Sequence, residues 1–370
     1  MSDNEIYPLK FDEIFKEKIW GGRRLESFLG KRLPENKFIG ESWELVDRKK
    51  NISIVKNGEY KGDKLNKLIK SFKEKLIGKD IKLSRGNRFP LLFKYIDASE
   101  KLSIQVHPDD EYAYLNERDE TGKTEAWYVI WAKPGAQLVC GFKKQMSKRS
   151  FKKVIERKKI EDYLNYITVY KGDLIFLPAG TLHTIMGGVI LAEIQQNSDA
   201  TYRIFDWDRV DRYGKSRELH IDKALDIIDF SLVRNYKIQP LSIKIDRNVI
   251  NYLIVCEKFA VELCEIEDKY QLKCDGSKFY ILSFLEGNGE ILYGSKFYRR
   301  VEIKKGETIL LPATLNKTII KTDGKLKFLK FYVPDIKKDI IKPLSDKGFT
   351  NKEIVRLGGW DKVNDIMKYF

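Results

Sequence analysis

Two histidines, a glutamate and a glutamine lie at or beside expected strands, where their side chains could bind one divalent metal ion. Gln105 and His107 are separated by one residue, and on a β-strand this spacing places both side chains on the same face. Glu125 begins a second strand-like run, EAWYVIW, and His183 follows a Pro-Ala-Gly turn after the run DLIFLP. Imidazole, carboxylate and amide groups form a mixed N/O ligand set that suits zinc, iron or nickel. We therefore expect a catalytic metal site that keeps open positions for water or substrate.

The remaining histidine and the cysteines are interpreted as structural. Taken alone, His107 would more often be hydrogen-bonded within the fold than bound to a metal. Glu125 favours the metal, because it begins an apolar run in which an unpaired carboxylate would be costly. His220, in RELHIDKALDII, falls at the expected start of a helix and lies outside the candidate metal site. The four cysteines show no C-x-x-C spacing, so we expect free thiols at Cys140, Cys256, Cys264 and Cys274.

Charged residues near the candidate ligands could move protons. Glu193 lies in an alternating, strand-like run, Asp199 and Arg203 follow it four residues apart, and Lys123 precedes the EAWYVIW run. An acid, a base and a cation beside a metal are what proton abstraction next to a carbonyl group requires, because the enediolate oxygens must be stabilised. A structural ion pair between Asp199 and Arg203 is an equally good interpretation of those two residues taken alone.

Length and composition place the chain among folded globular proteins. It has 370 residues, of which 42% are hydrophobic and 12% aromatic, which is enough for two domains or one domain with a satellite. No apolar run reaches the roughly 18 residues of a membrane helix, and the N-terminal residues lack the pattern of a secretory signal. We therefore expect a cytoplasmic protein that binds no membrane.

The net charge of +15 does not by itself predict a nucleic-acid partner. The lysines are spread along the chain and mixed with Asp and Glu, which is typical of a solvated surface and not of a basic stripe with interleaved aromatic residues. We expect no nucleic-acid binding. The positive charge does suit an anionic small-molecule substrate, although only weakly.

The first 235 residues should combine strands with a few helices. The expected elements are strands at 41–47 and 52–58, a helix at 63–77 capped by Asp63, a hairpin of 90–96 with 102–106, strands at 167–178 and 189–198, and helices at 147–166 and 218–230. The long charged loop 108–124 joins His107 to Glu125, so we expect it to rim the site.

The rest of the chain is rich in strands and contains an internal repeat. The sequence KGDLIFLPA at 171–179 returns as KGETILLPA at 305–313, and with a one-residue deletion Asn316 falls where His183 stands. The second copy should therefore be a duplicated β-unit without the metal. We expect a metal-binding domain at 1–235, a metal-free domain at 236–335 and a helical tail at 336–370.

The tail itself has a clear helix start. Thr350 and Glu353 are spaced as a capping box, and Gly358 and Gly359 end the helix. We expect this tail to pack on the molecule or to support a dimer.

Four segments of the chain resemble a known family. QVHPDDEYA, GKTEAWYVI, GDLIFLPAGTLH and EIQQNSDATYRIFDWDR, in this order and at fitting spacing, resemble the type I mannose-6-phosphate isomerases, a zinc cupin family, in its shorter bacterial branch. The resemblance covers roughly residues 8–335. It implies a mainly β fold of two cupin-like, jelly-roll β-barrels with a few helices, to which the short helical C-terminal tail is added.

The resemblance also implies roles for individual residues. One zinc ion per chain would be bound by Gln105, His107, Glu125 and His183; the active-site positions would be Lys123, Glu193, Asp199 and Arg203; and substrate would contact Trp20, with Ser103 and Lys94 at its phosphate. The implied reaction is the reversible conversion of mannose 6-phosphate to fructose 6-phosphate through a cis-enediol, which is an aldose–ketose isomerisation. Arg203 would stabilise the enediolate, and one of Glu193, Asp199 or Lys123 would transfer the proton.

Other functions stay open at this point. The fold could belong to a non-catalytic sugar-phosphate-binding cupin or to another metal-dependent cupin enzyme such as an oxygenase, because cupins host many chemistries. Ile185 stands where longer members of the family carry a tyrosine, and the tail 336–370 lies outside the matched region. We expect the partner to be a small sugar phosphate and the protein to be a monomer or a homodimer.

Overall fold

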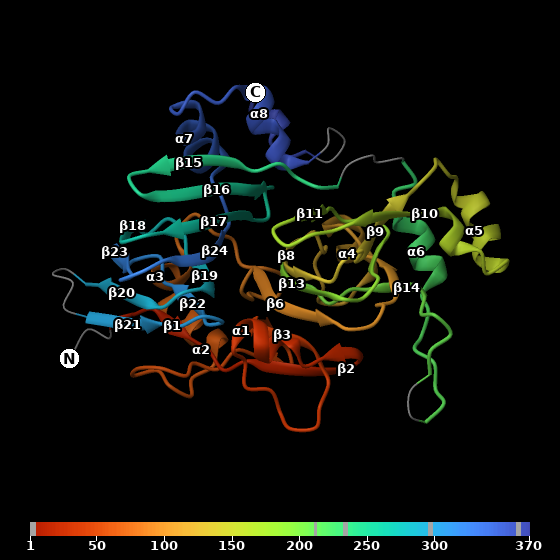
Figure 1. Ribbon diagram of the computed structural model, residues 1–370, viewed down its shortest axis with the longest axis horizontal. Coiled ribbons are helices and arrows are strands. Elements are labelled where there is room, and N and C mark those ends of the chain that lie inside the picture. Colours follow the sequence, from red (N-terminus) through yellow and green to blue (C-terminus); the bar gives the residue numbers. More distant parts are fainter. Residues whose placement is uncertain (1–4, 211–212, 232–235, 295–298, 360–363) are drawn as a thin grey trace.

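The structure, a computed structural model, is built mainly from β-strands in four larger sheets and one small one. It describes residues 5–210, 213–231, 236–294, 299–359 and 364–370. Figure 1 shows two β-rich halves side by side, with the short helices at the periphery. The mainly β fold class is therefore confirmed. Within the described residues, no helix combines the length and apolar character needed to cross a membrane.

Residues from the first half form two facing sheets. The six-stranded sheet has the order β11 (Leu174–Leu177), β8 (Glu125–Ala132), β13 (Val189–Gln196), β6 (Leu91–Ala98), β3 (Ile39–Leu45) and β2 (Ile14–Gly22). The five-stranded sheet has the order β10 (Leu164–Thr168), β9 (Gln137–Phe142), β12 (His183–Ile185), β7 (Ile104–Val106) and β14 (Tyr202–Phe205). Helices α5 (Lys148–Glu156) and α6 (Ile221–Ile227) lie beyond the second sheet (Figure 1).

The second half repeats this plan. Its seven-stranded sheet has the order β1 (Leu9–Lys10), β22 (Thr308–Leu311), β19 (Tyr280–Glu286), β24 (Leu326–Tyr332), β17 (Ala260–Ile266), β16 (Asn248–Val255) and β15 (Leu241–Ile245). Its four-stranded sheet has the order β18 (Lys269–Cys274), β23 (Asn316–Lys321), β20 (Gly289–Tyr293) and β21 (Arg299–Ile303). A small pair, β4 (Asp47–Arg48) and β5 (Asn51–Ile52), completes the strands.

The internal repeat corresponds to a structural duplication. Strands β22-β19-β24-β17-β16-β15 follow the same spatial order as β11-β8-β13-β6-β3-β2, and β21-β20-β23-β18 follow that of β10-β9-β12-β7. The turn before each repeated strand needs a left-handed glycine, and Gly172 (φ 92°) and Gly306 (φ 83°) supply it. Strand β1 pairs with β22, so the first residues of the chain complete a sheet of the second half.

One hydrophobic core runs through both halves and includes the tail. The rings of Phe93 and Phe331, one from each half, lie 4.7 Å apart between centroids. The tail contains η2 (Ile336–Ile341), α7 (Lys342–Ser345), α8 (Asn351–Val355), η3 (Arg356–Gly358) and η5 (Met367–Tyr369). Ile354 and Leu357 from this tail are fully buried in the same core. The capping box between Thr350 and Glu353 is present in both directions, as predicted.

The helix predicted for residues 63–77 is interrupted, and the prediction of an Asp63 cap is wrong. The structure has α2 (Leu65–Phe72) and α3 (Glu74–Ile77), separated by Lys73 with φ 47°. The first helical amide, that of Leu65, donates to the Ser53 carbonyl oxygen at 2.9 Å, so a neighbouring backbone takes the place of a side-chain cap. Asp63 instead pairs with Lys67, at 2.6 Å between Oδ1 and Nζ.

The predicted hairpin of residues 90–96 and 102–106 is also wrong. β6 pairs with β13 and β3 in the six-stranded sheet, whereas β7 pairs with β12 and β14 in the facing sheet. The intervening turn therefore crosses from one sheet to the other. Strand alternation alone cannot distinguish these cases, because both connections join two half-buried strands by a short polar turn.

Three further expectations need adjustment. The loop 108–124 contains α4 (Asp110–Asn116), whose cap Asp109 accepts the Tyr112 amide at 2.8 Å. The helix predicted at 147–166 ends at Glu156 and is followed by the 3₁₀ turn η1 (Ile160–Tyr163), because Leu164 already starts β10. The strand predicted at 52–58 is reduced to β5 and isolated bridges. A short helix, α1 (Arg24–Leu29), completes the described elements near the site.

Candidate metal centre and active site

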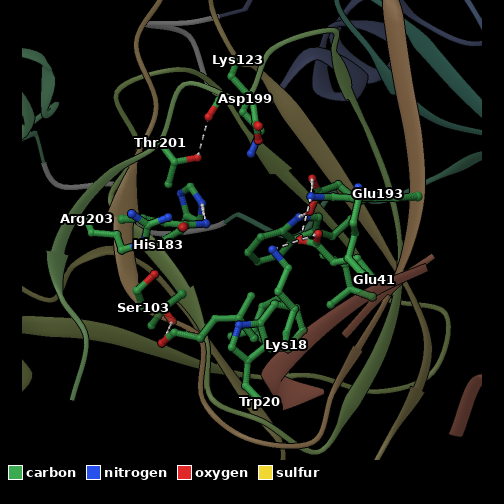
Figure 2. Close-up of a pocket in the computed structure, with 18 of the residues that line it drawn as sticks. Lys18, Trp20, Glu41, Ser103, Lys123, His183, Glu193, Asp199, Thr201 and Arg203 are labelled. Carbon is green, nitrogen blue, oxygen red and sulfur yellow. Dashed lines mark hydrogen bonds and ion pairs between the residues drawn. The ribbon is translucent and has the colours of Figure 1, made fainter. Parts of the chain in front are cut away.

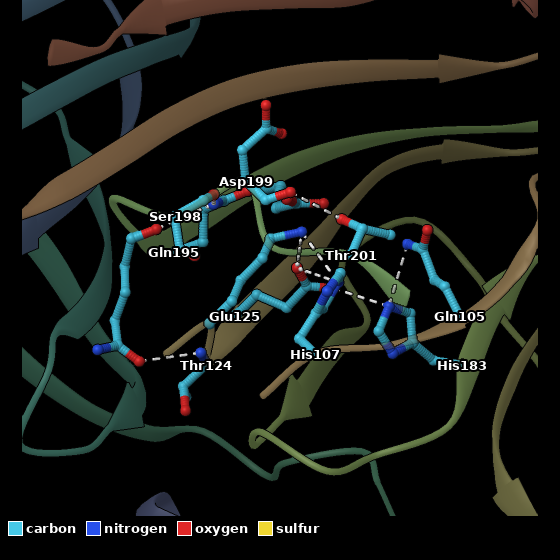
Figure 3. A network of polar contacts seen from close by, with 12 residues as sticks. Gln105, His107, Thr124, Glu125, His183, Gln195, Ser198, Asp199 and Thr201 are labelled. Atoms are coloured by element: carbon cyan, nitrogen blue, oxygen red, sulfur yellow. Dashed lines mark hydrogen bonds and ion pairs between the residues drawn. The ribbon is translucent and has the colours of Figure 1, made fainter. Parts of the chain in front are cut away.

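The structure brings His107, Glu125 and His183 together. Their ligand atoms all lie within 4.8 Å of one another, and each side chain is 1–2% exposed. His183 Nε2 is 3.3 Å from Glu125 Oε1, and His107 Nε2 is 3.5 Å from Glu125 Oε2. Gln105 lies beside them, with its Nε2 3.3 Å from His183 Nε2 (Figure 3). The four predicted ligands therefore form one group.

Strand pairing explains why these residues meet. His183 is the first residue of β12 and faces Gln105 of β7 directly across the ladder. His107 follows β7 immediately, and Glu125 is the first residue of β8 in the facing sheet. The group is thus assembled between two sheets, from segments that are up to 78 residues apart along the chain.

Both imidazoles are oriented by backbone carbonyl groups and are held neutral. His107 Nδ1–H donates to Ala200 O at 2.8 Å, and His183 Nδ1–H donates to Thr181 O at 2.8 Å. Each Nε2 therefore carries the lone pair that a metal needs, and that of His107 accepts a hydrogen bond from Lys123 Nζ at 2.9 Å. Burial lowers the pKa of His183 to about 4, and burial together with the nearby Lys123 ammonium lowers the pKa of His107 well below its usual range.

The Glu125 carboxylate shows that the group fits a cation. Both of its oxygens are buried and have no hydrogen-bond partner, although the Lys123 ammonium lies 3.0 Å from Oε2. A buried carboxylate that faces two neutral imidazoles is costly unless a positive charge is placed between them. A divalent ion bound by this set would satisfy that requirement, with Gln105 as a further donor.

A cavity of about 290 Å³ opens beside this group and gathers the remaining predicted residues. Its lining includes Gln105 and His183 from the ligand set, together with Trp20, Lys94, Ser103, Lys123, Glu193, Asp199 and Arg203. Figure 2 shows the labelled side chains surrounding a common central space. Every residue that was expected to bind substrate or to act in catalysis therefore lines one cavity. Ile185 lines it too, so an apolar side chain occupies that part of the wall.

A buried row of alternating charges forms one wall. Lys94 Nζ is 3.1 Å from Glu193 Oε1 and 3.4 Å from Glu41 Oε1. Burial would raise the pKa of Glu41, but Lys94 and Lys18 outweigh it and lower that pKa to about 2. Burial and the Glu125 charge raise the pKa of Glu193, against the opposing effect of Lys94. Glu41 is therefore a fixed anion, whereas Glu193 is suited to take up a proton.

Arg203 lies on the opposite side of the cavity. Its Nε is buried without a hydrogen-bond partner, and burial together with the Arg217 charge lowers its pKa. Among the ion pairs of the described residues, Asp199 and Arg203 are not joined to each other, so the structural ion pair considered above is not formed. Arg203 is thus available to an anionic ligand.

The sequence analysis missed several residues of the cavity, among them Lys16, Lys18, Glu41, Thr201 and Arg217. A signal existed for two of them: Lys16 and Lys18 alternate with Trp20 along β2, so all three share one face of that strand. Glu41 had no such signal, because a carboxylate in ESWELVD is equally compatible with the solvent face.

The residues interpreted as structural lie elsewhere. His220 precedes α6 and belongs to no metal-binding group among the described residues. The four cysteines are buried free thiols, as predicted.

Comparisons with known proteins identify one family. Residues 9–134 match the family model for the catalytic domain of type I phosphomannose isomerase, and residues 248–331 match the model for the cupin domain of mannose-6-phosphate isomerase. Mannose-6-phosphate isomerase ManA of Bacillus subtilis is 37% identical over 311 residues, which are 84% of this chain and 94% of that protein. The mannose-6-phosphate isomerase of Streptococcus mutans is 34% identical over 322 residues, or 87% and 97% of the two chains.

Solved structures give the same result. The crystal structure of mannose 6-phosphate isomerase from Bacillus subtilis superimposes with a TM-score of 0.80 at 36% identity, covering 88% of this chain and 99% of that one. A variant of phosphomannose isomerase from Salmonella typhimurium superimposes with a TM-score of 0.69 at 17% identity, covering 88% and 99%, and supports the fold alone.

Proposed function

The chain belongs to the type I phosphomannose isomerase family, and from this premise we propose that it interconverts mannose 6-phosphate and fructose 6-phosphate. The observation that carries the proposal is the buried His107–Glu125–His183 group opening into a cavity lined by Glu193 and Arg203. The reaction moves a proton between adjacent carbons of a sugar phosphate. Such a transfer needs a group that holds a proton and a positive charge that stabilises developing oxyanions.

The metal in this proposal is one zinc ion per chain. Gln105, His107, Glu125 and His183 would bind it, and their N/O donor set without thiolate supports a catalytic ion. When bound, zinc would supply the Lewis acidity that polarises the sugar's C1 and C2 oxygens.

For proton transfer we favour Glu193 over the other two candidates, Lys123 and Asp199. Its raised pKa is supported by burial and by the Glu125 charge, and Trp127 Nε1–H donates to its Oε2 at 2.8 Å, which holds the carboxylate in place. Arg203 would stabilise the negative charge of the enediolate, because its buried Nε has no partner in the protein. Asp199 and Lys123 would orient the substrate or share the proton transfer.

Substrate binding would involve Trp20 and Ser103, which are buried side chains in the wall of the cavity. Lys94, which was also expected at the phosphate, is paired with two carboxylates, so we propose that it chiefly sets the charge state of Glu193. We further propose a cytoplasmic enzyme, supported by four buried free cysteines that suit a reducing compartment, and a monomer or homodimer.

A coupled assay that follows fructose 6-phosphate from mannose 6-phosphate tests the proposal. We expect turnover that a chelator removes and zinc restores. The His107→Ala variant should lose both zinc and turnover, because it removes a ligand, whereas the His220→Ala variant should keep its zinc content. Absence of turnover in folded, zinc-loaded protein would contradict the isomerase and favour a non-catalytic sugar-phosphate-binding cupin. Oxygen consumption that depended on iron, without formation of fructose 6-phosphate, would indicate an oxygenase.

A further inference from the structure

We propose that Glu120 and Arg48 form a positioning pair that holds the turn 197–200, which carries Asp199 into the cavity and supports a metal ligand. This inference deepens the proposed function and rests on it for its catalytic consequences. Neither residue lines the cavity, and both contact the backbone of the turn. They come from different parts of the chain, Arg48 from β4 and Glu120 from the segment between α4 and β8.

Glu120 contacts the turn through one carboxylate oxygen. Its Oε2 accepts the Asp199 backbone N–H at 3.1 Å. The Ser198 hydroxyl lies 3.3 Å from the same oxygen and 2.7 Å from Thr121 O, so its one proton is donated mainly to Thr121. Its Oε1 accepts a hydrogen bond from Arg48 Nη2, which also makes the two residues an ion pair. The Glu120 side chain is 19% exposed and that of Arg48 is 9% exposed, so solvent screens this charge-assisted contact only in part.

Arg48 contacts the other end of the same turn. Its Nη1 donates to the Asn197 carbonyl oxygen at 2.9 Å, across 149 residues of sequence. The carbonyl group of residue 197 and the amide of residue 199 are thus both held by one ion pair. The Asn197 side chain adds a second connection to the same strand, because its Nδ2 donates to Asp47 O at 2.9 Å.

The position of this turn affects two functional groups. Asp199 lines the cavity, and Ala200 O accepts the Nδ1–H of His107 at 2.8 Å, which orients that imidazole toward Glu125. Figure 3 shows Ser198, Asp199 and Thr201 lying directly beside the candidate metal ligands. A displacement of the turn would therefore move a candidate proton-transfer residue and weaken the support of a ligand at the same time.

The pair requires a carboxylate at residue 120. The Glu120 oxygens accept hydrogen bonds from the Arg48 guanidinium and from the Asp199 backbone amide, so both of these partners are donors. Glutamine has the same shape, but its amide nitrogen would face one of these donors and leave it unsatisfied. Glu120→Gln is therefore a change of charge and acceptor number at constant volume.

The test compares the Glu120→Gln variant with Asp119→Asn as a matched control. Asp119 is the adjacent residue, and its exposed carboxylate pairs with Lys49 at 2.8 Å. At saturating zinc we expect kcat of Glu120→Gln to fall by roughly 10- to 100-fold with KM changed less than about 2-fold, because misplaced catalytic groups impair the chemical step. Zinc affinity, measured by chelator competition, should weaken by about 10-fold. Asp119→Asn should match the parent protein in both measurements.

A second readout is independent of turnover. Amide hydrogen exchange of residues 197–200 should be at least about 10-fold faster in Glu120→Gln and in Arg48→Lys than in the parent protein, because one anchor of the turn is lost. Unchanged exchange together with unchanged zinc affinity would overturn the inference even if the parent protein proved inactive. An inactive parent protein with faster exchange in the variants would contradict the isomerase proposal and leave the positioning pair supported.

Discussion

At the scale of single residues, the site depends on neighbouring charged side chains of alternating sign. Lys18 and Lys94 both lie within 3.4 Å of the Glu41 carboxylate, and Trp43 Nε1–H donates to it at 3.1 Å. These three contacts stabilise the Glu41 anion strongly enough to overcome the cost of burial. Glu41 in turn shares Lys94 with Glu193, so it influences the carboxylate that we favour for proton transfer.

The depressed pKa of Glu41 predicts an acid-dependent loss of stability. Its pKa is about 2 in the folded protein, against 4.5 for an ordinary glutamate. The pairing therefore contributes stability above about pH 4.5, and this contribution is lost as the pH falls toward 2, because the unfolded chain then binds the proton more readily. The full effect is about 3 kcal/mol of unfolding free energy. Urea unfolding of metal-free protein between pH 7 and pH 3 should show about 2 kcal/mol of it, because Glu41 is still largely ionised in the folded protein at pH 3.

The Glu41→Gln variant should show a shallower loss across the same pH range. Glu17→Gln is its control, because Glu17 lies on the adjacent strand β2 and its side chain is 62% exposed. That control should follow the parent protein. If Glu41→Gln also lost stability as steeply as the parent, another group would be responsible for the acid dependence.

At the scale of elements, each half has one carboxylate–ammonium pair across equivalent strands, but the carboxylate and the ammonium have exchanged strands. In the first half, Glu193 of β13 faces Lys94 of β6. At the equivalent strand pair of the second half, Lys330 of β24 faces Glu262 of β17, with Nζ 2.7 Å from Oε2. The Lys330 ammonium also lies over the rings of three tyrosines, Tyr270, Tyr280 and Tyr332, at 5.4–5.8 Å from their centroids. In the second half, a buried ammonium and aromatic rings thus lie at the strands equivalent to those that carry Glu193 and Lys94 in the first half.

This arrangement predicts that the pair in the second half is structural. The variant Lys330→Met should lose about 3–5 kcal/mol of unfolding free energy, because it leaves the Glu262 carboxylate buried without its cation. The double variant Lys330→Met/Glu262→Leu should recover most of that loss, since no buried charge remains. Chemical denaturation of the three proteins measures both values.

Zinc content should be unchanged in these variants, because the predicted ligands all lie in the first half. A double variant no more stable than the single variant would show that the loss comes from packing and not from the unpaired charge. Reduced zinc content in Lys330→Met would contradict the separation of the two interiors.

At the scale of the whole molecule, the C-terminal tail packs on its own chain. Ile340, Leu344, Ile354 and Leu357 are all completely buried in the core that joins the two halves. Figure 1 shows α7 and α8 next to β15 and β16, at the upper edge of the view. The tail thus covers apolar surface that would otherwise face water.

Removing residues 336–370 should therefore destabilise the protein and promote aggregation, because the apolar surface under the tail becomes exposed. A milder change, Ile354→Ala, should cost about 2–5 kcal/mol through the cavity it leaves. Lys352→Ala in the same helix is the control, since Lys352 is exposed. Thermal unfolding and light scattering measure these effects.

A tail-deleted protein with unchanged stability would show that the packing contributes little. A change from dimer to monomer at unchanged subunit stability would instead assign the tail to a dimer interface.

The local features of the site could be predicted from the amino-acid sequence. The spacing of Gln105 and His107, the apolar run after Glu125 and the turn before His183 depend only on strand periodicity and turn chemistry. The repeat of KGDLIFLPA and the Thr350–Glu353 capping box were readable for the same reason. Each of these signals involves residues within a few positions of one another.

The distant residues that complete the site could not be predicted in this way, because the folding of the chain brings them together. The separation of β6 and β7 into facing sheets, and the approach of Glu41 to Lys94 and of Glu120 to residue 199, depend on strand pairing across many residues. Local periodicity carries no information about such pairing, because a buried strand has the same pattern whichever partner it takes. The charge states of Glu41 and Glu193 follow from that pairing, since burial and the neighbouring ions set them.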